Sequence, residues 1–161
     1  MTMPMWRILM ACFLFAVSGC ASTPQATPER DALAKQFAAD PEKATVYIYR
    51  PGANFNTSTE DISTVLYVDN RVIGSTLAGV YFLVHLTPGT HVLSGIATDQ
   101  GRMTLQVEAG RLYFVSIRVQ NGSSIFTQVS VDSGKRDVSN CCTLYENANP
   151  DGGSSFPTIQ L

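Results

Sequence analysis

The sequence predicts an all-β antiparallel sandwich of about seven or eight strands with a short N-terminal helix. From Ala44 onward, apolar residues recur with a period of two, as in strands that bury one face. These segments are also rich in β-branched and aromatic residues, which favour strands. Turn-forming residues separate them at intervals of roughly ten to eighteen residues. These turns are Pro88-Gly89, Asp99-Gln100-Gly101, Ala109-Gly110, Asn121-Gly122 and Ser133-Gly134.

The first 19 residues have the organisation of a secretory signal peptide. Arg7 precedes an apolar run, Ile8 to Val17, and small residues follow it. The run has about ten residues, whereas a helix needs roughly twenty to cross a bilayer. We therefore expect residues 1–19 to be removed.

The segment Val17-Ser18-Gly19-Cys20 resembles the signal box of bacterial lipoproteins. The resemblance implies a diacylglycerol thioether on Cys20, cleavage after Gly19 and acylation of the new amine. Because each buried methylene contributes about 0.8 kcal/mol, two or three acyl chains hold a protein on a membrane essentially permanently. Ala21 in place of aspartate implies sorting to the outer membrane, facing the periplasm. The alternative is an ordinary signal peptide whose cleavage site happens to hold a cysteine.

Residues 20–43 are predicted to form a lipidated tether that contains a short helix. Ala21 to Pro28 is small, polar and proline-containing, so we expect it to be disordered. Thr27 is placed to cap a helix with Pro28 in its first turn. Leu33 and Phe37 would share one face of that helix, which Asp40-Pro41 would end.

Residues 44–146 are predicted to form the sandwich, and residues 147–161 a flexible tail. Asp69-Asn70 lies between two apolar runs and predicts a hairpin. The early strands are apolar on both faces, so a second layer, the helix or a partner must cover them. These two faces carry Leu66, Val68 and Ile73 on one side and Val65, Tyr67 and Val72 on the other, and Val80 to Leu86 is almost continuously apolar.

Alternation is clearest in the second half of the chain, where one side of each strand is expected to be core and the other solvent. The predicted core faces are Met103, Leu105 and Val107, then Tyr113, Val115, Ile117 and Val119, then Ile125, Val129 and Val131.

Four segments between Asp40 and Leu144 together resemble, in order and spacing, the bacterial lipoprotein domain of unknown function DUF2846. They are DPEKATVYIYRP, VLYVDNRVIGS, GVYFLVHLTPGTHVL and EAGRLYFVSI, and Cys142-Thr143-Leu144 fits the end of such domains. The resemblance implies a small β-sandwich and supplies no established catalytic residues.

Motifs for catalysis or cofactor binding are missing from the sequence. It contains no Gly-x-Ser-x-Gly elbow, no Ser-x-x-Lys pair and no phosphate-binding loop ending in Gly-Lys-Ser/Thr. The formal net charge is −2, with no basic run, which argues against nucleic acid as a partner. We expect a protein that is not an enzyme and needs no cofactor.

The two histidines and the last two cysteines are the remaining chemical candidates. A two-residue turn at Pro88-Gly89 would put His85 and His91 on opposite faces, whereas a three- or five-residue loop would put them together. Solvated strand histidines are favoured over a metal site. For Cys141 and Cys142, one buried and one exposed thiol are favoured over a strained vicinal bridge, and an intermolecular disulfide is a further alternative.

The expected function is that of a membrane-anchored envelope lipoprotein that presents a non-enzymatic module to another envelope component. Tyr47, Tyr49 and Tyr81 are candidates for a partly exposed aromatic docking face, and the alternative is that the helix and loops cover them. A second hypothesis is a peptidoglycan, glycan or small-ligand module that uses the loop Gly52 to Asp61 beside Tyr47 or Tyr49. Glu60-Asp61 in that loop is interpreted as a solvated pair.

Overall fold

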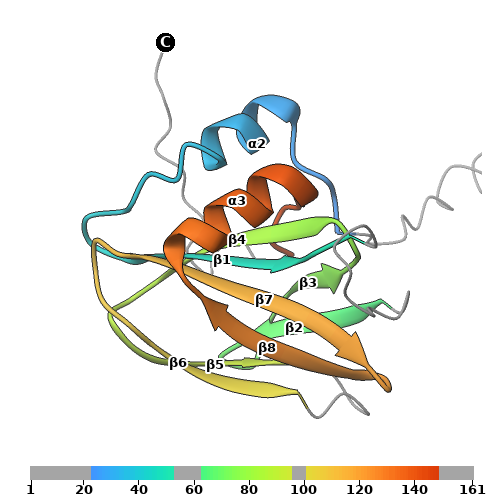
Figure 1. Ribbon diagram of the computed structural model, residues 1–161. Helices are drawn as coiled ribbons and strands as arrows, with labels where there is room; N and C mark the ends of the chain where they lie inside the picture. The colour runs from blue at the N-terminus through green and yellow to red at the C-terminus, as the bar shows by residue number, and fades with distance from the viewer. Residues whose placement is uncertain (1–22, 53–62, 96–100, 149–161) are drawn as a thin grey trace, which may run out of the picture.

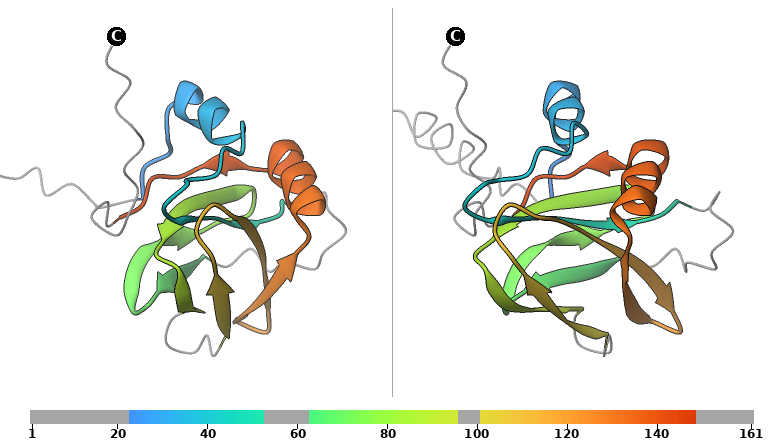
Figure 2. Two further views of the ribbon diagram at one scale, coloured as in Figure 1. Left: turned by 90° about the vertical axis from the view of Figure 1, so that its left-hand side faces the viewer. Right: turned by 60° about the vertical axis from the view of Figure 1, so that its left-hand side comes forward.

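The computed structural model describes residues 23–52, 63–95 and 101–148, which form three layers (Figure 1). Two helices lie over a five-stranded sheet, and a four-stranded sheet lies on the other side of it, as the two turned views in Figure 2 also show. The predicted fold class, an all-β sandwich with a short N-terminal helix, is confirmed.

The two sheets divide the nine strands of the described residues unevenly. In spatial order, the larger sheet consists of β8 (Ser123–Val129), β7 (Leu112–Gln120), β1 (Ala44–Arg50), β4 (Val80–Leu86) and β9 (Thr143–Leu144). The smaller sheet consists of β3 (Arg71–Thr76), β2 (Thr64–Val68), β5 (Gly89–Ser94) and β6 (Arg102–Val107). The helices are α2 (Pro28–Ala34) and α3 (Val131–Cys141).

Two strand pairs differ from the predicted antiparallel arrangement. β1 pairs with β7 in parallel, and β4 pairs with β9 in parallel. Each pair is joined through long stretches of chain, which allow a parallel return, whereas tight turns give antiparallel neighbours. The remaining pairs, including β1 with β4 and β7 with β8, are antiparallel as predicted.

The main core lies between the two sheets, where the inward residues of both meet. Most of the predicted inward faces are confirmed, including Leu66, Val68 and Ile73, then Leu105 and Val107, then Val115 and Ile117. In β8 the prediction is wrong, because Phe126 packs against this core while Ile125 is 37% exposed. The two residues point to opposite faces of the strand, so the sequence pattern selected the wrong face.

The structure also corrects the prediction of a turn at Ser133-Gly134, because both residues lie within α3. Ser130 caps this helix, and its hydroxyl accepts a hydrogen bond of 3.3 Å from the Ser133 amide. Gly134 packs against the ring of Phe114 so closely that a Cβ would collide with it. Val131 therefore begins a helix and does not end a strand.

Helix α2 begins as predicted, with Thr27 at the N-cap and Pro28 in the first turn. It ends at Ala34, before Phe37, which has a left-handed φ of 53°. As a result Leu33 and Phe37 do not share a buried face. Leu33 is 44% exposed, while the ring of Phe37 packs on Tyr47 with their centroids 5.2 Å apart.

The segment before α2 is ordered against the end of the domain, so the expected disorder is wrong for residues 23–28. Gln25 forms a β-bridge with Tyr145, and the Ala26 amide donates to the Leu144 carbonyl at 2.9 Å. The Glu146 amide in turn donates to the Pro24 carbonyl at 2.9 Å. The folded unit therefore includes residues 23–28, ahead of α2.

The predicted hairpin at Asp69-Asn70 is confirmed, since both residues have positive φ and join β2 to β3. Pro88-Gly89 is different, because β4 and β5 belong to different sheets and the chain crosses the sandwich there. Neither predicted hairpin register for His85 and His91 therefore applies.

Candidate functional site

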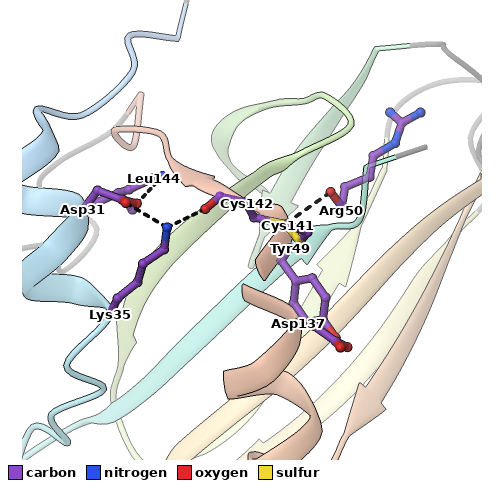
Figure 3. The surroundings of a disulfide bond; sticks show 8 residues. All are labelled: Asp31, Lys35, Tyr49, Arg50, Asp137, Cys141, Cys142 and Leu144. Atoms are coloured by element: carbon purple, nitrogen blue, oxygen red, sulfur yellow. Dashed lines mark hydrogen bonds and ion pairs between the residues drawn. A yellow bond between two sulfur atoms is a disulfide. The ribbon is translucent and has the colours of Figure 1, made fainter. Parts of the chain in front are cut away.

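A vicinal disulfide marks the junction between α3 and β9. Cys141 and Cys142 are bonded to each other, at the point where the backbone changes from helical to extended (Figure 3). The favoured expectation of one buried and one exposed thiol is wrong, and the vicinal bridge is present instead. Cys142 is 5% exposed and Cys141 is half-buried, so the bridge has one accessible side.

The disulfide lies where three chain segments meet. Cys142 Sγ is 3.7 Å from the carbonyl oxygen of Arg50, the last residue of β1. The same oxygen accepts a hydrogen bond of 2.9 Å from the Gly79 amide, and the Gly79 carbonyl accepts one of 3.0 Å from Thr143. The bridge therefore lies against the end of the central strand β1 and the residue that precedes β4.

A charged clasp, made of Asp31 and Lys35, connects α2 to the residues around the disulfide (Figure 3). Lys35 Nζ donates to Asp31 Oδ2 at 2.8 Å and to the carbonyl oxygen of Cys142 at 2.7 Å. Asp31 Oδ1 accepts from the Leu144 amide at 2.8 Å. Burial opposes ionisation of Asp31, but the hydrogen bonds from Lys35 and Leu144 outweigh it and lower the pKa of this carboxyl. The clasp thus holds α2 against β9.

The three candidate docking tyrosines are buried, which makes the exposed aromatic face wrong. Tyr47, Tyr49 and Tyr81 are 1%, 1% and 0% exposed. Their hydroxyls donate respectively to the Ala34 carbonyl at 2.6 Å, to Asp137 Oδ2 at 2.6 Å and to the Asp31 carbonyl at 3.4 Å. Burial raises the pKa of all three phenols. The alternative, that a helix covers these tyrosines, therefore holds. Part of the cover comes from α3, a helix that the sequence did not indicate.

The two histidines lie apart, each beside its own carboxylate. His85 Nδ1 is 3.6 Å from Asp40 Oδ2, and burial lowers the pKa of this imidazole. His91 Nδ1 is 2.6 Å from Asp69 Oδ2, while its Nε2 is 2.8 Å from the Thr87 carbonyl. Neither is a freely solvated strand histidine. Across the described ranges, no group of three or more His, Cys, Asp or Glu side chains could hold a metal ion.

Several sequence-predicted positions lie outside the described residues. These are Cys20, the signal peptide 1–19, Glu60-Asp61 and the proposed binding loop beyond Gly52. In the described part of the chain, no helix has both the length and the apolar character needed to cross a membrane.

The chemistry available at this site is thiol–disulfide exchange. A thiolate that attacks one sulfur of a disulfide forms a mixed disulfide and releases the other sulfur as a thiolate. Lys35 bonds the backbone of Cys142, Asp31 bonds that of Leu144, and Asp137 bonds the Tyr49 hydroxyl. None of the three was predicted as a site residue. The spacing of Asp31 and Lys35 was the only available signal, since an acidic residue four positions before a lysine favours an ion pair.

Two packed sheets closed on one side by helices define a small β-sandwich module. The chain belongs to the family described as "Protein of unknown function (DUF2846)", which matches residues 40–136. It is also similar to an uncharacterized protein of Haemophilus influenzae, with 31% identity over 130 residues that cover 76% of this chain and 74% of the relative. The predicted family resemblance is thereby confirmed.

Proposed function

We propose that this protein is a lipid-anchored lipoprotein of the bacterial cell envelope, which presents a rigid, non-enzymatic β-sandwich to another envelope component. The lipid would be attached to Cys20, in the outer membrane and facing the periplasm. Only Ala21 and Ser22 separate Cys20 from Thr23, the first described residue of the fold.

The contact of Thr23 with strand β3 is the observation that carries this proposal. The Ser75 amide of β3 donates to Thr23 Oγ1 at 3.2 Å. A Cβ on Gly74 would lie 2.7 Å from the ring of Phe82 and 2.9 Å from Thr23 Cγ2, so the absence of a side chain at Gly74 makes room for both. An acylated Cys20 would therefore hold the domain directly beside the membrane, without a long tether.

The vicinal disulfide supports a location outside the cytosol. Disulfides persist in oxidising compartments such as the bacterial periplasm and are rare where thiol reductants are abundant. The Cys141–Cys142 bridge fits an exported protein for that reason.

The interaction with a partner would use the exposed surface of the sandwich, since the tyrosines under the helices are inaccessible. The glycan-binding alternative loses two of its stacking residues, Tyr47 and Tyr49, for the same reason. Photo-crosslinkers at exposed positions in living cells would identify the partner as a protein or as cell-wall glycan.

The anchor is tested by growing cells with a labelled fatty acid and comparing the native chain with Cys20→Ala and the control Ser22→Ala. We expect label and membrane association in the native and Ser22→Ala proteins, and loss of both in Cys20→Ala. Label that persists in Cys20→Ala would contradict the proposal, because no other group is expected to carry the thioether.

A further inference from the structure

The outer face of the four-stranded sheet is not covered by the helices, which lie on the opposite side of the sandwich (Figure 2). One row of residues crosses all four strands of this face. Val72 of β3 pairs with Tyr67 of β2, Tyr67 with Ser94 of β5, and Ser94 with Arg102 of β6. Paired residues in antiparallel strands share a face, so we call these four residues the outer row.

The composition of this row is amphipathic. Val72 is 39% exposed and Arg102 is exposed, while Tyr67 is half-buried between them. Tyrosine and arginine both combine an apolar body with a polar or charged end, which suits the boundary between lipid headgroups and acyl chains. The half-buried Val65 and Val92 extend the apolar part of the face to either side.

The strands of the four-stranded sheet carry positive charge. β2, β3, β5 and β6 contain two arginines, Arg71 and Arg102, and no carboxylate in any of their described residues. The helices carry charges of both signs, such as the exposed Asp132 and Arg136 of α3. An anionic lipid surface would therefore attract the two arginines of the sheet.

The position of Thr23 links the β3 edge of this sheet to the anchor. Thr23 contacts Gly74 and Ser75 of β3, which is the edge strand of the four-stranded sheet. Three Cα–Cα steps of about 3.8 Å connect Cys20 to Thr23, so the chain allows the proposed anchor to be at most about 11 Å from Thr23. Val72 is two residues from Gly74 on the same strand.

We propose that the outer row and its apolar neighbours rest on the phospholipid headgroups of the membrane that holds the anchor. This inference rests on the proposed lipid anchor at Cys20. It orients the molecule: the four-stranded sheet faces the bilayer, and the helices α2 and α3, on the opposite side of the sandwich, face away from it. The surface open to a partner is then the helical side.

The test places one tryptophan at a time in the lipidated full chain and measures quenching by brominated phospholipids. The protein is reconstituted in bilayers of phosphatidylethanolamine and phosphatidylglycerol. The introduced tryptophan is then the only one in the mature chain, because Trp6, the only tryptophan in the sequence, lies within the removed residues 1–19. Val72→Trp is compared with Val131→Trp at the start of α3, a matched valine that is 38% exposed. Leu33→Trp, 44% exposed on α2, reports on the helical side.

We expect a loss of fluorescence in Val72→Trp and no loss in Val131→Trp or Leu33→Trp. Equal quenching at all three positions, or quenching only at Leu33→Trp, would overturn the orientation. Each sample is also assayed for incorporated fatty acid. An unlabelled protein would overturn the anchor and this inference together, whereas a labelled protein without quenching in Val72→Trp would overturn the orientation alone.

Discussion

The hydroxyl of Tyr49 donates a 2.6 Å hydrogen bond to Oδ2 of Asp137, and this contact ties the central strand β1 to the helix α3. Tyr49 is 1% exposed, so the bond forms where water has little access. Burial, and then the neighbouring Asp137 carboxylate, raise the pKa of this phenol. Tyr49 therefore serves the packing of α3 on the sheet.

We predict that Tyr49→Phe lowers the free energy of unfolding by about 1.5–3 kcal/mol, the usual contribution of a hydrogen bond to a charged group. Urea unfolding of Tyr49→Phe, Asp137→Asn and the double variant would measure it. The coupling energy of this cycle isolates the Tyr49–Asp137 interaction. Additive effects of the two substitutions would show that the bond contributes nothing.

The clasp gives a second prediction, at the Leu144 amide. Asp31→Ala removes the acceptor of this amide and one partner of Lys35. We expect hydrogen exchange of Leu144 to accelerate in the native state, because the opening of α2 and β9 becomes easier. Ala32→Gly, at an exposed position of the same helix, controls for a general loss of helix stability. Unchanged exchange in Asp31→Ala would show that the clasp is not needed to hold β9.

Gly134 provides a test of how α3 packs. In an exposed helix position, Gly→Ala would stabilise the protein by about 1 kcal/mol. Here the added Cβ would collide with the ring of Phe114, so we expect Gly134→Ala to destabilise by about 1–3 kcal/mol. Thermal unfolding would measure this, with Ser139→Ala on the exposed side of α3 as control. A higher melting temperature for Gly134→Ala would mean that the helix is free to move away from Phe114.

His91 makes stability depend on pH. Burial opposes its charged form, but the hydrogen bonds to Asp69 and to the Thr87 carbonyl outweigh burial and raise the pKa above the ordinary 6.5. Because the folded-state pKa is the higher one, this stabilisation is fully present below about pH 6.5 and is lost as pH rises through the folded-state pKa. We expect the stability advantage of the native protein over His91→Gln to shrink on going to alkaline pH.

His85 is the natural comparison, because burial lowers the pKa of this imidazole. The effect of pH is opposite to that at His91. Burial favours the neutral form of His85, so acidification below about pH 6.5 lowers the free energy of unfolding of the native protein. Relative to His85→Gln, the native protein should lose stability in acid. Chemical denaturation at several pH values measures both effects. Parallel pH profiles for the two variants would contradict the assignments.

The parts of the fold that could be predicted were governed by local rules. Asp69-Asn70 tolerates the positive φ that a tight hairpin needs, and Thr27 with Pro28 has the chemistry of a helix start. The alternation in β6 and β7 depends only on which residues face the core. Each of these features is decided within a few residues of sequence.

The parts that were missed depend on contacts distant in sequence. Gly134 resembles a turn residue, but in α3 its missing side chain makes room for Phe114. Tyr49 looks like an interface residue until α3 covers it. The disulfide was disfavoured from the short distance between adjacent Cα atoms, although Cys141 and Cys142 are bonded where helix gives way to strand. Asp31 and Lys35 gained a role only through Cys142 and Leu144.

The mass of the N-terminal peptide of the mature protein, isolated from membranes, tests the central proposal most directly. We predict that this peptide begins at Cys20 and carries a diacylglycerol thioether together with an amide-linked fatty acid. A mature chain that retains residues 1–19, or one that begins with an unmodified cysteine, would contradict the lipid anchor and with it the proposed placement of the sandwich on the membrane.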